Sequence, residues 1–333
     1  MFDVFELQKQ LVLAARPSGT EHTVGALIAA LAKPYCDEIR TDALGNVICR
    51  KAGPGKKIMF SAHMDVIGFI ALKADKSGNI LVDKIGGQRA AQLNHTPVRF
   101  ENGVKGVVRL KTNDKAGSSL GMTDLYVDIG ACSQEEAMEL VPVGTRAMFD
   151  APTELLEGGK LLTPYADDLS ACVAQLMAME RIKTHHNDLY FVFSVQEEVG
   201  CKGAGVAAFG IDPDLGVACD VCYCADDPAA KKDMVVKLGG GATIKIKDAG
   251  SVGTPEAVEF LRAAARDAGE TWQDEILTAG GTDTRTIQLS RDGVAAACIS
   301  IPCRGIHSPA EMVAVSDVES AARLMAAAAA RVL

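Results

Sequence analysis

The 333-residue chain lacks three features typical of nucleic-acid-binding, membrane-spanning or exported proteins. It has 34 Lys and Arg against 43 Asp and Glu, a net charge of -9, and no basic stripe that could bind phosphates. No apolar run approaches the roughly 18 residues that span a bilayer. The N-terminus, Met1 to Glu6, is acidic where a secretory signal is basic. We therefore expect no nucleic-acid partner, no membrane partner and a cytoplasmic location.

The ten cysteines lack the setting in which they would form a disulfide framework. They are spread through apolar segments of a long chain without an export signal, so we expect most of them to be reduced core residues. Cys222 and Cys224 form a C-x-C pair, but no second Cys or His pair stands at ligand spacing. This disfavours a zinc site built on that pair.

Length and pattern predict two domains in an α/β protein. Residues 1–69 and 161–333 alternate apolar helix and strand segments, whereas residues 70–160 consist of short strand patterns separated by turns. The simplest arrangement is an α/β domain interrupted by an inserted β-rich domain, since insertions that leave and re-enter at nearby surface points disturb the host fold little.

Local signals support this division. Asn102-Gly103 between two apolar runs predicts a hairpin. The segments from Ser133 to Glu136 and from Ser316 to Glu319 each have the pattern of a capping box that opens a helix. Three of the longer helices are expected at residues 168–182, 255–268 and 316–332.

Metal-type side chains follow the apolar runs of the α/β part. Four such runs are Ile58 to Phe60, Leu189 to Val195, Leu215 to Cys219 and Val294 to Ile301. In an open α/β sheet, ligands bind beyond the carboxyl ends of the strands, so side chains far apart in sequence converge there. The candidates that we expect to converge are His63, Asp167, Glu198, Asp220 and His307.

Two imidazoles and three carboxylates suit two zinc or cobalt ions, because one carboxylate can bridge them. The chemistry indicated is hydrolysis by metal-activated water. Asp65 follows His63 by two residues, on the same side of an extended chain, where it can accept the second ring N–H of His63. Glu197 and Glu198 end an apolar strand, where a carboxylate pair is costly unless a metal or a function holds it. Their side chains diverge, so one can bind metal while the other faces substrate.

These motifs resemble the tetrahedral-aminopeptidase family, which includes glutamyl, leucyl and deblocking aminopeptidases and some members labelled endoglucanases. The resemblance covers nearly the whole chain. The matching segments are Ala62 to Asp65, Asp167-Asp168, Val195 to Gly200, Asp220-Val221, Gly281 to Asp283, Ile299 to Pro302 and Ile306 to Pro309.

The resemblance implies a zinc-exopeptidase-like α/β/α catalytic domain with an inserted PDZ-like domain that serves self-association into dimers or dodecamers. It implies that His63 and Asp220 hold one metal, that Glu198 and His307 hold the other, and that Asp167 bridges them. Glu197 would be the general base for attack of a bridging hydroxide on short peptides. The resemblance also implies a cis peptide between Asp167 and Asp168.

Two candidate substrate-binding residues, Asp283 and Arg285, lie in or after a Gly-rich stretch that the resemblance places beside the metals. Arg285 stands where a small residue is expected, and its guanidinium could pair with an acidic N-terminal side chain of the substrate. The alternative is a surface arginine paired with a nearby carboxylate.

Other activities remain open at this stage. An N-acyl amino-acid deacylase or another amidohydrolase could use the same two-metal core. A glycosidase would use paired carboxylates without metal, and two positioned histidines suit it poorly. The preferred N-terminal residue, the metal used in the cell and the number of subunits do not follow from the sequence.

Overall fold

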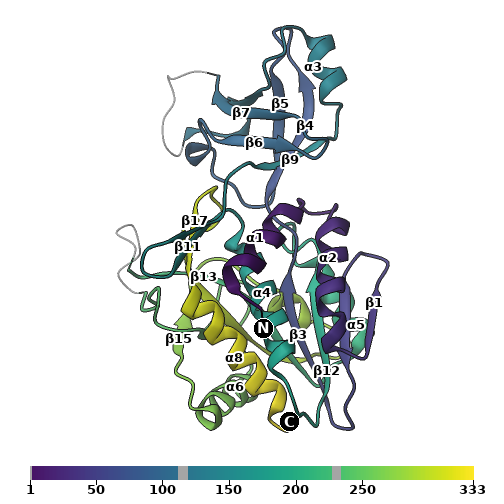
Figure 1. Ribbon diagram of the computed structural model, residues 1–333, viewed down its shortest axis with the longest axis vertical. Coiled ribbons are helices and arrows are strands. Elements are labelled where there is room, and N and C mark those ends of the chain that lie inside the picture. The colour runs from purple at the N-terminus through teal and green to yellow at the C-terminus, as the bar shows by residue number, and fades with distance from the viewer. Residues whose placement is uncertain (1, 112–118, 227–233) are drawn as a thin grey trace.

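The computed structural model describes residues 2–111, 119–226 and 234–333. Two parts are evident, a larger one built on a long sheet with helices and a smaller barrel that stands above it in the view (Figure 1). This is the α/β fold with a β-rich insertion that the sequence predicted. None of the described helices is long and apolar enough to cross a membrane.

The larger part is organised by an 11-stranded mixed sheet with the main order β1-β2-β12-β3-β13-β16-β17-β11-β10, in which β14 pairs with β15 and β16. Its central strands β12, β3, β13 and β16 are mutually parallel, and β2 and β17 flank them antiparallel. The strands are β1 Glu38–Thr41, β2 Val47–Lys51, β3 Lys57–His63, β10 Glu154–Leu156, β11 Lys160–Thr163, β12 Asp188–Ser194, β13 Leu215–Tyr223, β14 Thr243–Lys247, β15 Gln273–Ile276, β16 Ala295–Arg304 and β17 Glu311–Ala314.

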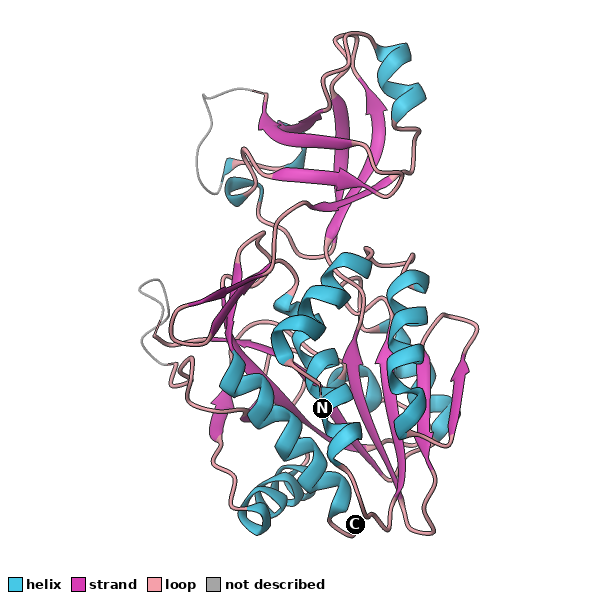
Figure 2. Ribbon diagram, viewed as in Figure 1, coloured by secondary structure: helices cyan, strands magenta, loops and turns pink. Residues whose placement is uncertain are grey.

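Helices cover both faces of this sheet (Figure 2). The main core packs α1, α2, α4, α6 and α8 on one face, and a smaller cluster packs α5 and α7 on the other. The apolar stripe of α4 is almost entirely buried, which makes it the central helix of the molecule. The helices are α1 Val4–Ala14, α2 His22–Ala32, α4 Ala166–Arg181, α5 Lys202–Ile211, α6 Pro255–Ala268, α7 Thr284–Ile287 and α8 Val315–Ala330.

The carboxyl ends of the parallel strands carry the predicted ligands. His63 is the last residue of β3, Glu198 follows β12 by four residues, and His307 follows β16 by three. The expectation that Asp220 follows a strand is wrong. It lies inside β13, paired with Ser300 of β16, because β13 continues three residues beyond it.

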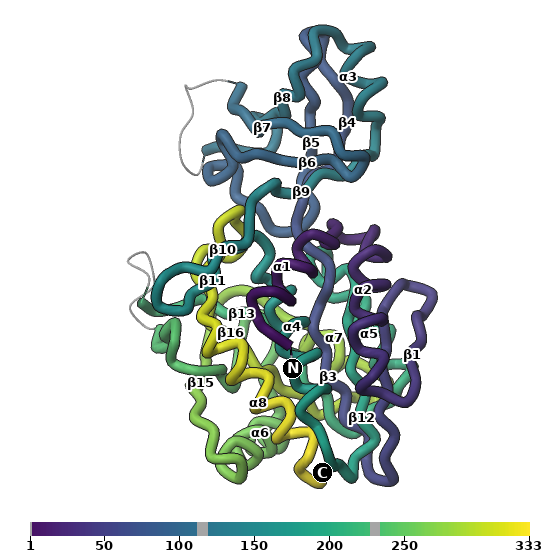
Figure 3. Tube along the Cα trace, viewed as in Figure 1, coloured from purple at the N-terminus to yellow at the C-terminus, as the bar shows by residue number. Residues whose placement is uncertain are grey.

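The smaller part is a closed six-stranded antiparallel barrel of order β4-β5-β8-β7-β6-β9. Its buried apolar residues are continuous with the main core of the larger part, and Figure 3 shows its chain leaving and re-entering the larger part at adjacent points. Strand β10, within the range expected for the insertion, joins the large sheet instead. The division into domains stays a prediction. The pairing of β10 favours a second boundary near 150, and the start of β4 at Gly68 favours a first boundary near 67. The barrel elements are β4 Gly68–Ala74, β5 Ile80–Ile85, β6 Pro97–Phe100, β7 Lys105–Leu110, β8 Leu125–Asp128, α3 Gln134–Leu140 and β9 Arg146–Phe149.

The hairpin predicted around Asn102-Gly103 is present as β6 and β7. The Ser133 hydroxyl accepts the amide of Glu136, while the Glu136 carboxylate accepts the amide of Cys132. The capping box predicted at Ser316 is wrong, since α8 begins at Val315 without a side-chain cap. The carboxylate of Asp317 instead accepts the amides of Gly239 and Gly241, so tertiary contacts replace the local cap.

Candidate active site

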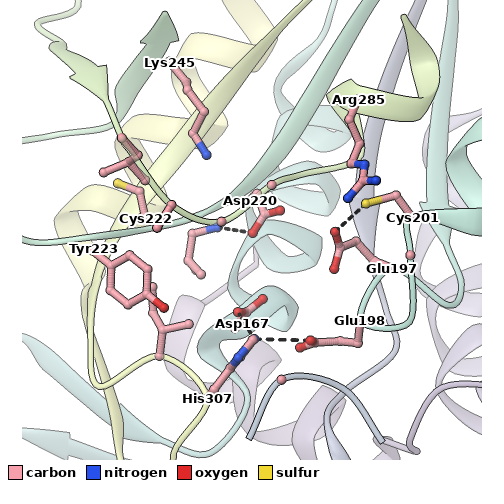
Figure 4. Close-up of a pocket in the computed structure, with 18 residues that line it drawn as sticks. Asp167, Glu197, Glu198, Cys201, Asp220, Cys222, Tyr223, Lys245, Arg285 and His307 are labelled. Carbon is pink, nitrogen blue, oxygen red and sulfur yellow. Dashed lines mark hydrogen bonds and ion pairs between the residues drawn. The ribbon is translucent and has the colours of Figure 1, made fainter. Parts of the chain in front are cut away.

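Asp167 stands between two histidines that come from opposite ends of the chain. Its Oδ1 lies 3.1 Å from Nε2 of His63, and its Oδ2 lies 3.2 Å from Nε2 of His307. The peptide bond between Asp167 and Asp168 is cis, as the resemblance implied. Because each carboxylate oxygen faces a different imidazole, the group has the orientation expected of a bridging ligand. Figure 4 shows Asp167 beside His307.

The ring of His63 is oriented by the backbone. Its Nδ1 lies 3.1 Å from the carbonyl oxygen of Asp65 and 3.5 Å from the Asp65 carboxylate. Donation from Nδ1–H to the carbonyl turns Nε2 toward Asp167, where it donates to the carboxylate when it carries a proton and can bind a cation when it does not. The carboxylate of Asp65 has other partners, since it accepts the amides of Glu197 and Glu198 and the Ser18 hydroxyl.

The five ligand candidates meet in two overlapping groups. His63, Asp167 and Asp220 form one, and Asp167, Glu198 and His307 form the other, with one ligand atom of each residue within 4.8 Å of those of its group. Within the second group, Nε2 of His307 lies 3.2 Å from Oε2 of Glu198. Oε1 of Glu198 is buried without a partner among the described residues. Buried oxygens of this kind are costly unless a cation completes their coordination.

The charged groups of this site shift one another's pKa values. Burial raises the pKa of Asp220 to about 8. For His307, burial alone would lower the pKa, but bonds to Asp167 and Glu198 outweigh it and raise the pKa to about 12. For Asp167, burial is opposed by hydrogen bonds from both histidines, which hold its pKa below the usual range. Without metal ions, the two histidines therefore act as the countercharges of the carboxylates.

Glu197 lies beside this cluster and lines a cavity of about 260 Å³ together with Asp167, Asp220 and His307. Its Oε2 is 3.9 Å from Nε2 of His63, and burial, the largest cause, raises its pKa well above the ordinary value. A carboxylate with a raised pKa at the edge of a metal-type cluster can exchange a proton with a reacting group.

Glu311 was not found from the sequence. It is 1% exposed, and its two oxygens accept the amides of His307, at 2.7 Å, and Asp167, at 2.8 Å. One carboxylate thus fixes the backbone at two of the candidate ligands. His307 needs such support because its φ of 65° lies in the left-handed region. The sequence could not indicate this role, because Glu311 on β17 and Asp167 on α4 come together only in the folded chain.

Two glycines of the barrel also reach this site. A Cβ on Gly87 would lie 2.9 Å from the ring of His307, and one on Gly86 would lie 3.1 Å from Oε2 of Glu198. Gly86 also has a φ of 82°. The segment after β5 therefore approaches the ligands as bare backbone, although the barrel contributes no ligand candidate.

The two candidate substrate-binding residues occupy different places. Arg285 is exposed, lines the cavity and points into it, and no ion pair is found for it among the described residues. Asp283 is 3% exposed and is not among the residues that line the cavity. Its Oδ2 accepts the hydroxyls of Ser61 and Ser194, at 2.8 and 2.6 Å.

The cluster of metal-type side chains agrees with the family to which the sequence is similar. A sequence profile of the M42 glutamyl aminopeptidase family matches residues 45–324, which is most of the chain. The chain belongs to this family. It is an M42 metallo-aminopeptidase, a peptide hydrolase.

Relatives of this M42 enzyme match it over almost its whole length. The lysyl aminopeptidase of Pyrococcus furiosus is 35% identical over 96% of this chain and 95% of its own. The structure of aminopeptidase APDkam598 from Desulfurococcus kamchatkensis superposes with a TM-score of 0.94 at 37% identity, covering 98% of this chain and 94% of that one. The Pyrococcus horikoshii TET1 peptidase, described as assembling into a tetrahedron or a large octahedral shell, has a TM-score of 0.87 at 30% identity, covering 98% and 99%.

We predict that Glu311→Gln weakens metal binding about 10- to 100-fold while the protein stays folded. The amide nitrogen of glutamine would face one of the two backbone N–H groups, so either Asp167 or His307 would lose its support. Metal titration of stripped protein measures the affinity, and circular dichroism measures the fold. Glu319→Gln, an exposed change on α8, is the control. Equal affinities for the two variants would contradict the role of Glu311.

Proposed function

We propose that this M42 aminopeptidase removes N-terminal residues from short peptides with two divalent ions, zinc or cobalt. His63 and Asp220 would hold one ion, Glu198 and His307 the other, and Asp167 would bridge them. The observation that carries this assignment is the orientation of Asp167, whose two oxygens face the two imidazoles. When bound, the ions would supply the Lewis acidity that lowers the pKa of water and polarises a carbonyl.

The residues of the chain fit two such ions. Imidazole nitrogens and carboxylate oxygens are ligands that zinc and cobalt accept. The bond from Nδ1 of His63 to the Asp65 carbonyl presents the free Nε2 to the cluster. The unpartnered Oε1 of Glu198 offers a further donor atom.

Glu197 is the proposed general base. Its Oε2 faces the His63 side of the cluster, where it can take the proton of the attacking water and later deliver it to the leaving amine. Asp65 positions this base rather than acting on substrate, because its carboxylate accepts the amide of Glu197. The same carboxylate holds the amide of Glu198, so base and ligand share one support.

We predict that chelation abolishes peptide hydrolysis and that zinc or cobalt restores it. His63→Ala and Asp167→Ala should lose bound metal as well as activity, because each change removes a ligand. Metal affinity should fall as the pH is lowered, since protons on His307 and Asp220 compete with the ions. Metal analysis and aminoacyl-chromophore assays measure both effects. Full activity of stripped protein would disprove the two-metal proposal.

We predict different outcomes for the two neighbouring glutamates. Glu197→Gln should keep both metals and substrate affinity while turnover falls by about two orders of magnitude or more, because only proton transfer is lost. Glu198→Gln should lose one metal. Metal stoichiometry and steady-state kinetics separate the cases. If both variants bind the same number of ions, the roles assigned to the two carboxylates are wrong.

The barrel is the proposed surface for self-association. Apolar side chains on and beside its helix α3 are exposed, with Leu140 at 42% and Val143 at 67%. Exposed apolar side chains close together in the chain can be covered by another chain. The assemblies described for the TET1 peptidase and for the PhTET1-12s dodecamer support self-association of this chain, for which we propose a dimer or a dodecamer.

We predict that Leu140→Asp with Val143→Asp lowers the particle mass in light scattering, because two charges would be buried at the subunit contact. Leu13→Asp, at an exposed leucine of α1 outside the barrel, is the control and should leave the mass unchanged. Point changes are preferred to removal of the barrel, since Gly87 contacts His307. An unchanged mass in the double variant would refute this surface.

Substrate preference is proposed from the charges of the cavity wall. Lys245 lines the cavity but is 4% exposed and pairs with Glu275 at 3.2 Å, so its charge is already balanced. The guanidinium of Arg285 is the lining cation that remains available. It can pair with an acidic N-terminal side chain in a bidentate manner.

We predict that the wild type prefers N-terminal Glu or Asp and that Arg285→Ala lowers kcat/KM for these substrates about tenfold or more, the loss of one charge-assisted pair. Cleavage of Leu substrates should not change and serves as the internal control. A panel of aminoacyl-chromophore substrates measures both. If the wild type prefers Leu substrates and Arg285→Ala does not alter its specificity, the proposed role of Arg285 is wrong.

A further inference from the structure

A third group of metal-type side chains lies beside the dinuclear cluster. Glu197, Cys201 and Asp283 each place one ligand atom within 4.8 Å of the others. The sequence did not reveal this group, because its members come from the loop after β12, the start of α5 and the residue before α7. Cys201 and Asp283 are buried, at 2% and 3% exposure.

The loop that carries Glu197 brings the thiol to it. The carbonyl of Glu197 accepts the amides of Gly200 and Cys201, both at 2.8 Å, which closes one turn and sets the two side chains on the same side. The Cys201 carbonyl accepts the Thr286 hydroxyl, which ties this turn to α7. The thiol then donates to Oε1 of Glu197 across 2.7 Å (Figure 4).

The two oxygens of Glu197 thus face different partners. Oε2 lies 3.9 Å from Nε2 of His63, toward the dinuclear cluster, whereas Oε1 is held by the thiol. The two oxygens of Asp283 also have different surroundings. Oδ2 accepts hydrogen bonds from two serine hydroxyls, whereas Oδ1 is buried without a partner among the described residues. Asp283 therefore brings to the group a buried carboxylate that has one oxygen without a partner, which is costly unless a cation or a proton compensates it.

The electrostatic environment also suits a cation. Burial, followed by the charges of Glu197 and Asp283, raises the pKa of the Cys201 thiol. The same negative potential attracts a metal ion, which displaces the thiol proton on binding. A thiolate adds softness that the nitrogen and oxygen ligands of the dinuclear cluster lack.

We propose that Glu197, Cys201 and Asp283 form a third, inhibitory cation site that takes a thiophilic divalent ion such as Zn²⁺ or Cd²⁺. Binding breaks the S–H bond of Cys201, releases that proton to solvent and forms a metal–thiolate bond, with no change in oxidation state. The ion binds Oε1 of Glu197 and so lowers the basicity of the whole carboxylate, including Oε2, the proposed proton acceptor. The effect on activity rests on the proposed role of Glu197, whereas the binding itself does not.

The experiment loads the full-length protein with two equivalents of Zn²⁺ and then titrates Cd²⁺. A cadmium–thiolate bond has a charge-transfer absorption in the ultraviolet, and the dinuclear cluster, which has no thiol, cannot produce it. The wild type should bind a third equivalent, develop this absorption and lose activity. Cys201→Ser and Cys201→Ala should bind two equivalents, show no absorption and need at least about tenfold more Zn²⁺ or Cd²⁺ for half-inhibition.

Cys222→Ser is the matched control, because Cys222 also lines the cavity but lies outside the group. It should behave like the wild type. Loss of the absorption in Cys222→Ser, or its persistence in both Cys201 variants, would assign the thiolate elsewhere and overturn the proposal. So would a wild type that binds only two equivalents. Failure to bind the first two equivalents would instead contradict the dinuclear site, so the two failures are distinguishable.

Discussion

The concentration of carboxylates at one edge of the sheet is the constraint on which the rest of the site depends. Asp167 and Asp220 are buried within reach of two imidazoles, as is the side chain of Glu198, and a buried carboxylate without a countercharge is costly. In the metal-free chain, protons supply the missing charge, as the raised pKa values of Asp220 and His307 indicate. Divalent ions can replace those protons, so metal binding and proton release are two sides of one equilibrium.

Holding these groups together requires support from the backbone. Asp65 accepts the amides of Glu197 and Glu198, and Glu311 accepts those of Asp167 and His307. Each of the two carboxylates therefore fixes two functional residues that lie on different elements. These two buried carboxylates hold other residues in place, and hydrogen bonds from backbone N–H groups stabilise their negative charge. Loop conformations in the left-handed region, as at His307, persist because such bonds hold them.

The sequence predicted that five side chains converge because the end of an apolar strand can be recognised from a few neighbouring residues. This holds for His63, Glu198 and His307, which lie at or just after the ends of parallel strands that meet at one edge. Asp220 lies inside β13 and Asp167 on α4, so their places depend on where the strand and the helix begin and end. The sequence could not reveal Glu311 or Cys201, whose partners are set by tertiary contacts between distant elements. It placed Asp65 beside His63 correctly, yet the ring bonds to the backbone carbonyl more closely than to the carboxylate. Spacing along a strand gives proximity, whereas the choice between two acceptors on one residue depends on rotamers.

The inserted barrel is a second case in which the sequence predicted a separate part but not its contacts with the site. Its pattern of short strands and turns predicted a separate β-rich part without ligand candidates, and the barrel has that character. Yet Gly86 and Gly87 lie against Glu198 and His307, where a single added carbon would collide. A barrel that closes on itself can still shape a neighbouring site through bare backbone. The segment after β5 therefore connects the barrel, which carries the surface proposed for self-association, to the proposed metal ligands.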